Sequence, residues 1–267
     1  MTAVVDPYAV APPRGALAAL NPLAKLVGPL PAMLALVFAR DLLTPLVFLG
    51  VAVALVLIGA PLTRRTAAVL FVAIPVGAVV VGLSLGLWVD PSQVDDTPAI
   101  VSVGDWTLHA GAVQVGLATG ARLAAILALG LIVGLTTAGA DLVRAMVQQL
   151  RVPYRIGYTA LAAFRFVPRF AYELEVIRQA HRVRGAHGGR GPFAAIARWW
   201  GYVVPLLAGA IRHAERVALA MDARAFGAHR DRTERYRVPW RARDTVFVAV
   251  FWVASAAILV ALFPWSL

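Results

Sequence analysis

Cysteine is absent from the 267 residues, and charged side chains are scarce. Without cysteine the chain has no disulfide, no thiolate zinc site and no cysteine nucleophile. Charged residues make up 15% of the sequence and hydrophobic residues 60%, whereas an average soluble domain has about 25% charged residues. This composition excludes a disordered chain, and it disfavours a soluble enzyme because too little polar surface is available to cover the apolar material. An integral membrane protein is the first expectation.

Lysine is almost missing too, since the 25 basic residues are 24 arginines and one lysine. The sequence has neither a G-x-x-x-x-G-K-[ST] phosphate loop nor an H-E-x-x-H zinc motif. Gly82–Gly86 matches G-x-S-x-G, but it lies in an uncharged run with no His–Asp pair placed to serve it. Its glycines, like Gly116/Gly120 and Gly130/Gly134, favour close helix packing in a membrane.

Long runs without charge mark the membrane-spanning segments. About 20 apolar residues cross a hydrocarbon core of about 30 Å. Four runs reach or approach that length: Leu42–Leu62, Thr66–Val89, Leu123–Ala140 and Thr245–Leu267. A fifth run, Leu26–Ala39, has only 14 residues and contains two prolines. Its flanking residues Lys25 and Arg40 can snorkel and lengthen it, which predicts a span, with a re-entrant segment as the alternative.

The charges beside these runs predict the orientation. Arg64–Arg65 separates two runs, and the positive-inside rule places this pair in the cytoplasm. The connection Asp90–Ala110 holds four aspartates and no basic residue, so it is expected outside as a solvated loop. Residues 141–244 hold 19 arginines and eight acidic residues, a net charge of +11, and the rest of the chain is neutral overall. This block is therefore expected in the cytoplasm.

The expected fold class is an all-α polytopic membrane protein with about five transmembrane helices and cytoplasmic amphipathic helices. We expect a lead-in over 1–25, transmembrane helices over 26–140, a cytoplasmic region over 141–244 and a last transmembrane helix over 245–267. In a soluble protein the basic block would suggest nucleic acid, and a basic adaptor at the membrane surface stays an alternative.

The cytoplasmic block alternates arginines with apolar residues at helical spacing. One helix is predicted over Tyr154–Val183, followed by the helix-breaking sequence GAHGGRG at Gly185–Gly191. Pro192 suits the start of a second helix, over about Phe193–Phe226, with Gly227 as its C-cap. Two such stretches are more typical of a docking surface, on a membrane or a protein partner, than of a catalytic cleft.

Two tripeptides close these stretches: Val183-Arg184-Gly185 and Ala223-Arg224-Ala225. On a helix, Arg184 shares a face with Ile177, Ala180 and His181, and Arg224 shares one with Val217, Ala220 and Met221. A small residue on such a face lets a partner approach while the guanidinium reaches a carboxylate or a carbonyl. Solvated helix ends are the alternative interpretation.

Other polar residues point less clearly to a site. Arg122 interrupts an apolar run, so it either faces another subunit or snorkels to the outer interface. The five histidines are scattered singly, and no metal site is expected. Asp95–Asp96 suggests a metal–diphosphate site, as in membrane prenyl transferases, but no second acidic motif accompanies it. A membrane enzyme of lipid or prenyl metabolism is therefore the alternative function.

Several short segments resemble, in order, those of the transmembrane (T) component of energy-coupling factor transporters, which include bacterial cobalt and biotin uptake systems. The resemblance runs from about Leu20 to the C-terminus, and its segments are Pro22-Leu23-Ala24-Lys25-Leu26, Gly120-Ala121-Arg122-Leu123, Thr136-Thr137, Leu150-Arg151-Val152-Pro153, Arg165-Phe166-Val167-Pro168 and Ala220–Gly227.

The resemblance implies a non-catalytic plasma-membrane subunit without a cofactor. Such a subunit transmits motion from two ABC-type ATPases to a substrate-binding membrane subunit (the S component) that captures a vitamin or a metal ion. In that family two Ala-Arg-Gly or Ala-Arg-Ser motifs dock on the ATPases, which makes Arg184 and Arg224 the expected contacts. Val183 replaces the alanine of the first motif, and Ala225 replaces the Gly or Ser of the second.

Overall fold

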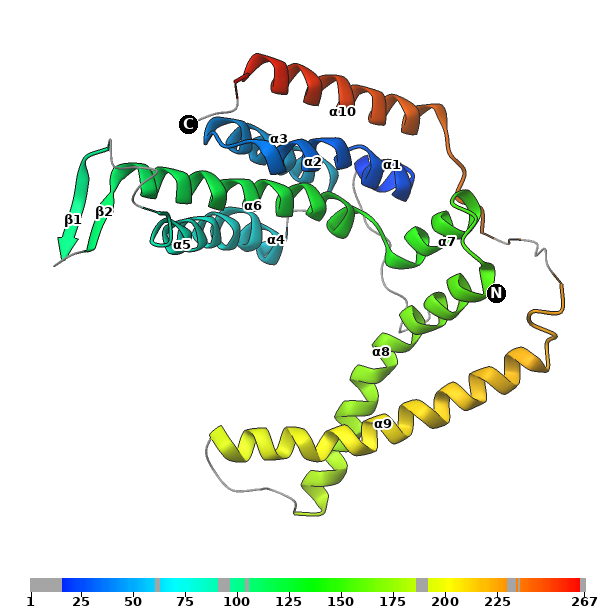
Figure 1. Ribbon diagram of the computed structural model, residues 1–267. Helices are drawn as coiled ribbons and strands as arrows, with labels where there is room; N and C mark the ends of the chain where they lie inside the picture. Colours follow the sequence, from blue (N-terminus) through cyan, green and yellow to red (C-terminus); the bar gives the residue numbers. More distant parts are fainter. Residues whose placement is uncertain are drawn as a thin grey trace. The chain divides into compact units, whose positions relative to one another are not determined.

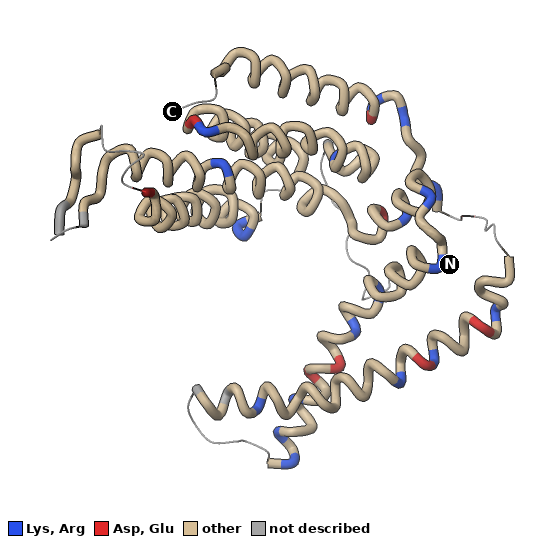
Figure 2. Tube along the Cα trace, in the orientation of Figure 1, with Lys and Arg blue, Asp and Glu red and all other residues tan. Residues whose placement is uncertain are grey.

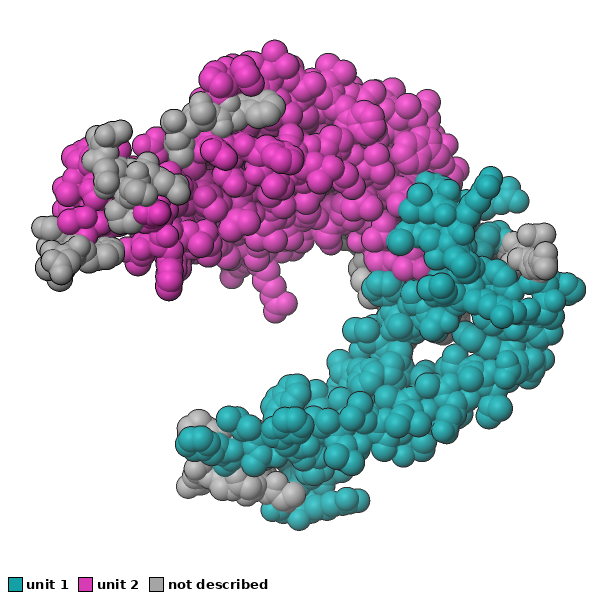
Figure 3. Space-filling view, in the orientation of Figure 1, with its two compact units in different colours: residues 1–11, 146–237 teal, residues 12–145, 238–267 magenta. Residues whose placement is uncertain are grey.

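The computed structural model describes residues 16–60, 63–90, 97–103, 106–185, 192–229, 234 and 236–264. The chain divides into two compact units, which Figure 3 colours separately. Unit 1 contains residues 1–11 and 146–237, and unit 2 contains residues 12–145 and 238–267. The described parts of both units are mostly helical (Figure 1).

Unit 2 is built from apolar helices. Its elements are η1 (Ala16–Ala19), α1 (Pro22–Val27), α2 (Leu30–Phe38), α3 (Leu43–Gly59), α4 (Arg64–Ala68), η2 (Val69–Ala73), α5 (Ile74–Gly86), β1 (Ala99–Val103), β2 (Trp106–His109), α6 (Ala110–Thr136) and α10 (Ala242–Ala261). The continuous helix α4–η2–α5, together with α6 and α10, is long and apolar enough to cross a membrane, and α1–α2 and α3 are shorter apolar helices. The predicted class of all-α polytopic membrane protein is confirmed.

The short segment predicted as Leu26–Ala39 consists of two helices rather than one. α1 ends at Val27 and α2 begins at Leu30, so Gly28 and Pro29 stand between them. Together they span Pro22–Phe38, which is still shorter than the other apolar helices named as membrane-crossing. The choice between a short span and a re-entrant segment therefore stays a prediction.

The helix α4–η2–α5 contains a π-helical turn, η2, which ends two residues before Pro75. In a regular α-helix a proline leaves one carbonyl without its N–H partner and its ring crowds the preceding turn. The wider π turn accommodates the proline without ending the helix. The helix thus runs on for 23 residues.

α5 packs against α6 through small residues. A Cβ atom added at Gly116 would overlap the Gly82 carbonyl oxygen, and one at Gly120 would overlap the backbone of α5. The sequence prediction of close packing is correct for these glycines. It is wrong within this chain for Gly130 and Gly134, where an added Cβ atom meets nothing within 4 Å.

A second face of α6 packs against α3 and completes the core of unit 2. Phe48, Ala52 and Val56 of α3 are buried together with Leu129 and Ile132 of α6. The helix α6 therefore lies between α3 and α5, and it is the most buried of the long apolar helices.

A hairpin stands in the connection that the sequence predicted to be a solvated loop. β1 pairs antiparallel with β2, and α6 begins directly after β2. The run Ala99–Val103 is rich in β-branched residues, which favour a strand. The sequence prediction missed the hairpin because the run is short and follows an acidic stretch.

The amphipathic helices are α7 (Gly139–Gln149), α8 (Tyr154–Val183) and α9 (Pro192–Asp222). α7 begins in unit 2 and ends in unit 1, whereas α8 and α9 lie wholly in unit 1. α8 has the predicted bounds, and α9 starts at the predicted proline. Figure 1 shows α8 and α9 crossing, and Figure 2 shows basic residues along both helices.

Candidate functional site

The first arginine tripeptide ends α8. Val183 is the last helical residue and is 90% exposed. Arg184 is the C-cap, and its backbone N–H donates to the Ala180 carbonyl at 3.2 Å. Gly185 follows with φ +67°, a left-handed conformation that glycine adopts without steric cost and that commonly ends helices. The tripeptide thus forms a sharp helix end that exposes the Arg184 side chain.

The second tripeptide lies beyond the end of α9. The helix ends at Asp222, so the predicted end at Phe226 is wrong by four residues. Residues 223–227 form a turn instead, in which Ala225 has φ +53° and Gly227 has φ +93°. The prediction that Arg224 continues the face of Ala220 is therefore wrong, because Arg224 belongs to the turn. Its side chain is exposed, like that of Arg184.

Aromatic side chains hold this turn against the start of α8. The Phe226 ring makes edge contacts with Tyr154 and Tyr158, at centroid distances of 5.6 and 6.0 Å. The Arg155 guanidinium donates to the Gly227 carbonyl at 2.9 Å, and the Tyr154 hydroxyl donates to the His229 carbonyl at 2.7 Å. The exposed Arg224 therefore lies in a turn that ring contacts and hydrogen bonds hold against the start of α8.

Sequence reasoning missed these anchoring residues. A signal was present, because Tyr154 and Tyr158 lie four apart and so share one face of α8. Nothing in the local pattern identified Phe226, which lies far along the chain, as the residue that fills this face.

The crossing of α8 and α9 contains a histidine. The His213 ring stacks on Phe166 with a centroid distance of 4.6 Å and an interplanar angle of 11°. Burial, together with the positive charges of Arg169 and Arg216, holds the pKa of His213 below its usual value of 6.5, and Glu173 acts in the opposite direction. The neutral imidazole is thus the form that this contact favours.

The first half of α9 carries exposed apolar side chains. Ile196, Trp199, Trp200 and Val203 line a shallow apolar hollow, and Val204 beside them is also exposed. Single exposed apolar residues are ordinary, but a contiguous group with two tryptophans is typical of an interaction surface. We call these five residues the tryptophan face.

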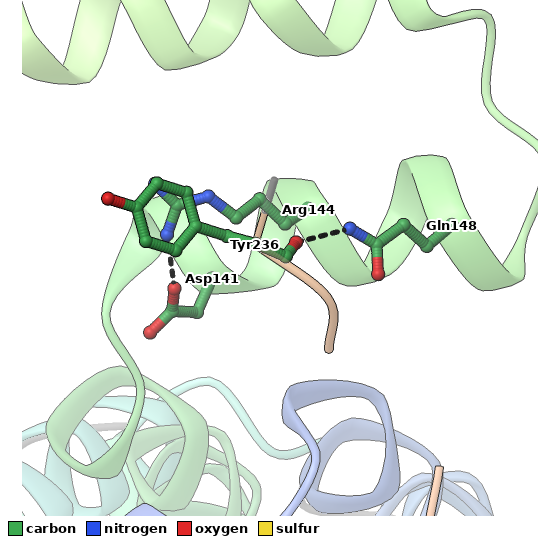
Figure 4. A network of polar contacts seen from close by, with 4 residues as sticks. All are labelled: Asp141, Arg144, Gln148 and Tyr236. Atoms are coloured by element: carbon green, nitrogen blue, oxygen red, sulfur yellow. Dashed lines mark hydrogen bonds and ion pairs between the residues drawn. The ribbon is translucent and has the colours of Figure 1, made fainter. Parts of the chain in front are cut away.

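Two polar contacts involve α7, one within the helix and one from the helix to Tyr236 (Figure 4). Arg144 pairs with Asp141 at 2.6 Å, one turn along α7. Near the other end of α7, the Gln148 amide donates to the Tyr236 carbonyl at 2.8 Å. The second bond joins the two ends of the segment 146–237 of unit 1.

Arg122 lies near the middle of α6 and is half-buried. Its apolar run offers no acid, but the charges of Arg40 and Asp41, between α2 and α3, act on its guanidinium. In the structure neither the Arg122 Nε nor the Asp41 Oδ1 atom has a hydrogen-bond partner. The sequence did not reveal this neighbourhood because it depends on the packing of α3 against α6.

The described residues contain no group of three or more His, Cys, Asp or Glu side chains that could hold a metal ion. Asp95 and Asp96, the pair that suggested a diphosphate site, lie outside the described residues. The alternative of a membrane lipid enzyme therefore gains no support from the described part of the chain.

Known proteins resemble this chain along most of its length. A family model described as CbiQ, cobalt transport protein, matches residues 15–235. The energy-coupling factor transporter transmembrane protein EcfT of Limosilactobacillus fermentum is 32% identical over 116 residues, 43% of each chain. EcfT of Thermotoga maritima is 36% identical over 99 residues, which is 37% of this chain and 36% of that protein.

A different kind of relative matches nearly the whole chain. A protein of Bifidobacterium longum, assigned by name to the ATP-binding proteins of ABC transporters, is 28% identical over 270 residues, 97% of this chain but 34% of its own length. The chain thus spans less than half the length of each of these three relatives. Because the family model covers well over half of the sequence, the chain belongs to the CbiQ family of cobalt transport proteins.

Proposed function

We propose that the chain is the non-catalytic transmembrane coupling subunit of an ATP-driven uptake transporter of the energy-coupling factor type. It receives motion from two ABC-type ATPases at Arg184 and Arg224 and passes it to a membrane subunit that binds a vitamin or a metal ion. The coupling region faces the cytoplasm, and the remaining helices lie in the plasma membrane.

The observation that carries this proposal is the matching geometry of the two helix ends. Each long helix stops at a backbone turn with a left-handed residue, and each turn exposes one arginine. An arginine can donate paired hydrogen bonds to a carboxylate or contact helix-end carbonyls, and a fixed turn lowers the entropy lost on binding. Two charged helix ends suit attachment to two copies of one partner.

The Bifidobacterium relative supports the choice of partner. That protein is named for ATP binding, and a region similar to nearly all of this chain occupies about a third of its length. In that organism a region of this kind and an ATP-binding protein are one polypeptide. A separate chain of the same family would need a non-covalent contact with its ATPase, which the two arginines can supply.

The tryptophan face supports the second partner. Its side chains are apolar and, apart from the half-buried Val203, exposed, and they lie on the helix α9 that Arg224 follows. A membrane subunit with an apolar surface could pack there, so that one rigid helix would contact both the ATPase and the substrate-binding subunit.

Copurification tests the proposal. The tagged chain is co-expressed with the ATPase and S-component genes of its own organism, and the bound subunits are quantified for Arg184→Ala, Arg224→Ala and the double variant. A charge-assisted hydrogen bond contributes about 1.5–3 kcal/mol. Each single change should therefore weaken ATPase binding by about tenfold or more, and the double change should weaken it further.

Arg212→Ala is the matched control, because Arg212 is an exposed arginine on α9 away from its end. It should leave ATPase binding unchanged. Full ATPase recovery with the double variant would contradict the assignment of these arginines, and the helix ends would then be solvated. Failure of the unchanged chain to recover any ATPase would contradict the proposed function itself.

A further inference from the structure

Two segments of the family resemblance have no part in the proposed ATPase contacts, and the structure brings them together. The Lys25 ammonium, on α1, donates to the Thr136 carbonyl, the last residue of α6, at 2.8 Å. Lys25 is 1% exposed and Thr136 is fully buried. A lysine buried to this degree is rare unless it is paired.

The chemistry of a helix end explains why a lysine lies there. The last four carbonyls of α6 have no partner within the helix and carry the negative end of its dipole. The Lys25 ammonium satisfies one of them and complements the dipole.

Asp244 joins a third helix to the same place. One carboxylate oxygen accepts from the Asn21 backbone N–H at 2.8 Å, and the other accepts from the Arg241 backbone N–H at 2.7 Å. Asn21 in turn caps α1 by accepting from the Leu23 N–H at 2.9 Å. Asp244, at 1% exposure, thus fixes the start of α10 to the start of α1.

We call Asn21, Lys25, Thr136 and Asp244 the anchor cluster. The cluster joins the start of α1, the end of α6 and the start of α10 through buried polar contacts. It also stands where the chain leaves α6, and α7 begins only two residues after Thr137. We propose that Lys25 is a positioning residue for coupling, which holds the end of α6 still while the amphipathic helices beyond it move.

The proposal rests on the proposed function, because it assigns a fixed attachment point to the amphipathic helices that the ATPases would move. A helix pair can transmit a displacement to a partner only if the point where it joins the membrane helices does not yield. Among the residues of α8 and α9 whose burial is described, only Gly157 and Gly209 are buried, so this part of the pair forms no apolar core that could provide the resistance. The anchor cluster is buried, charged and shared by three helices, so it can provide this resistance.

The first arm of the test needs neither ATPase nor substrate. Ala138→Cys, just beyond the cluster and half-buried, becomes the only cysteine of the chain. Its maleimide labelling rate reports how often the end of α6 opens. Lys25→Met should raise this rate by about tenfold, because one charge-assisted bond is lost. Overall stability should fall as well, because the buried Thr136 carbonyl loses its partner, so the rates are compared under conditions in which both chains stay folded.

The matched control is Trp252→Phe. It removes the 3.2 Å hydrogen bond from the Trp252 indole to the Val27 carbonyl, which joins α10 to α1 without involving α6. Labelling of Ala138→Cys should not change. If Lys25→Met does not accumulate in the membrane, Lys25→Gln, which keeps a donor but not the charge, takes its place.

The second arm uses the purified complex with its ATPases and compares labelling with and without ATP. In the otherwise unchanged chain, ATP should leave the rate at Ala138→Cys the same, because the end of α6 is held. In Lys25→Met, ATP should raise the rate further, because the motion now reaches α6. A purely structural lysine would not produce this dependence on ATP.

The outcomes are distinguishable. An unchanged labelling rate in the first arm shows that Lys25 does not hold α6 and overturns the proposal. A raised rate that does not respond to ATP in the bound complex also overturns it, leaving a structural contact only. If the ATPases do not bind at all, the proposed function fails and the coupling role falls with it, while the first arm still reports the anchoring.

Discussion

The two units of the chain differ in where their polar and apolar side chains lie. In unit 2 the charged residues Lys25 and Asp244 are buried and bonded, and many large apolar side chains face outward. In unit 1 the described residues of α8 and α9 are exposed or half-buried, apart from Gly157 and Gly209. An apolar surface around an apolar core, with the few buried charges bonded, is the pattern of a protein in lipid, where exposed apolar side chains need no further cover.

The described part of unit 1 has neither the bonded buried charges nor the largely apolar surface of unit 2. Its two long helices touch at one crossing and at one aromatic turn, and the tryptophan face lies on the first half of α9. A pair of helices with so little buried surface depends on other surfaces for stability. The comparison teaches that unit 2 has the surface of a protein in lipid, whereas the described helices of unit 1 leave most of their surface uncovered.

The strongest test of the comparison is at the close contact of α5 and α6. Gly116→Leu should prevent this packing, because the new side chain meets backbone of α5 that cannot move aside. The expected loss is about 3 kcal/mol, at the upper end of overpacking effects. Gly130→Leu, on the open side of the same helix, should cost little. Unfolding in a denaturing detergent, followed by circular dichroism, measures both; equal stability of the two variants would contradict the packing.

Apart from the β1–β2 hairpin, elements that depend on local pattern were predictable from the sequence, and those that depend on distant residues were not. Uncharged runs gave the apolar helices, and the glycine break gave the bounds of α8. The end of α9 was missed because Ala225 adopts a left-handed conformation, which alanine rarely does and which its residue type therefore does not predict.

The candidate site divides in the same way. The two exposed arginines followed from the tripeptides and the family resemblance. The contacts that fix or surround the sites, Lys25 with Thr136 and Phe226 with Tyr154, join residues far apart in the sequence. A single sequence carries no signal for such pairings, and only the packing of the helices brings them together.

A second test compares two aromatic residues of unit 1. Phe226→Ala removes the ring that contacts Tyr154 and Tyr158, so it should destabilise the turn by about 2 kcal/mol, less than a fully buried phenylalanine would. Trp200→Ala removes a ring that is 70% exposed, so it should leave stability unchanged but reduce binding of the S component. Hydrogen exchange and copurification separate the two effects. Loss of stability with Trp200→Ala would show that the Trp200 ring packs within unit 1 and is not available to a partner.

A smaller effect is expected at the turn after α9. Ala225 has φ +53°, and a left-handed conformation costs a residue with a Cβ atom about 1 kcal/mol relative to glycine. Ala225→Gly should therefore slow hydrogen exchange of the amides of residues 226–228 by up to about fivefold. Ala223→Gly, outside the left-handed position, is the control and should not slow exchange. Faster exchange in Ala225→Gly would mean that the alanine is not strained there.

The smallest effect concerns pH at the crossing of α8 and α9. Burial and the charges of Arg169 and Arg216 hold the pKa of His213 below 6.5 in the folded chain. The unfolded chain therefore binds more protons as the pH falls from 6.5 towards the folded pKa, and the contribution of this contact to stability is lost over that window. Above 6.5 the contribution is fully present. Because His213 is only half-buried, the change should be small, and His213→Gln should abolish it. Hydrogen exchange of α9 at about pH 7.5 and about pH 5.5 measures the difference; a crossing that tightens in acid would reverse the assigned sign and show that Glu173 prevails over the arginines.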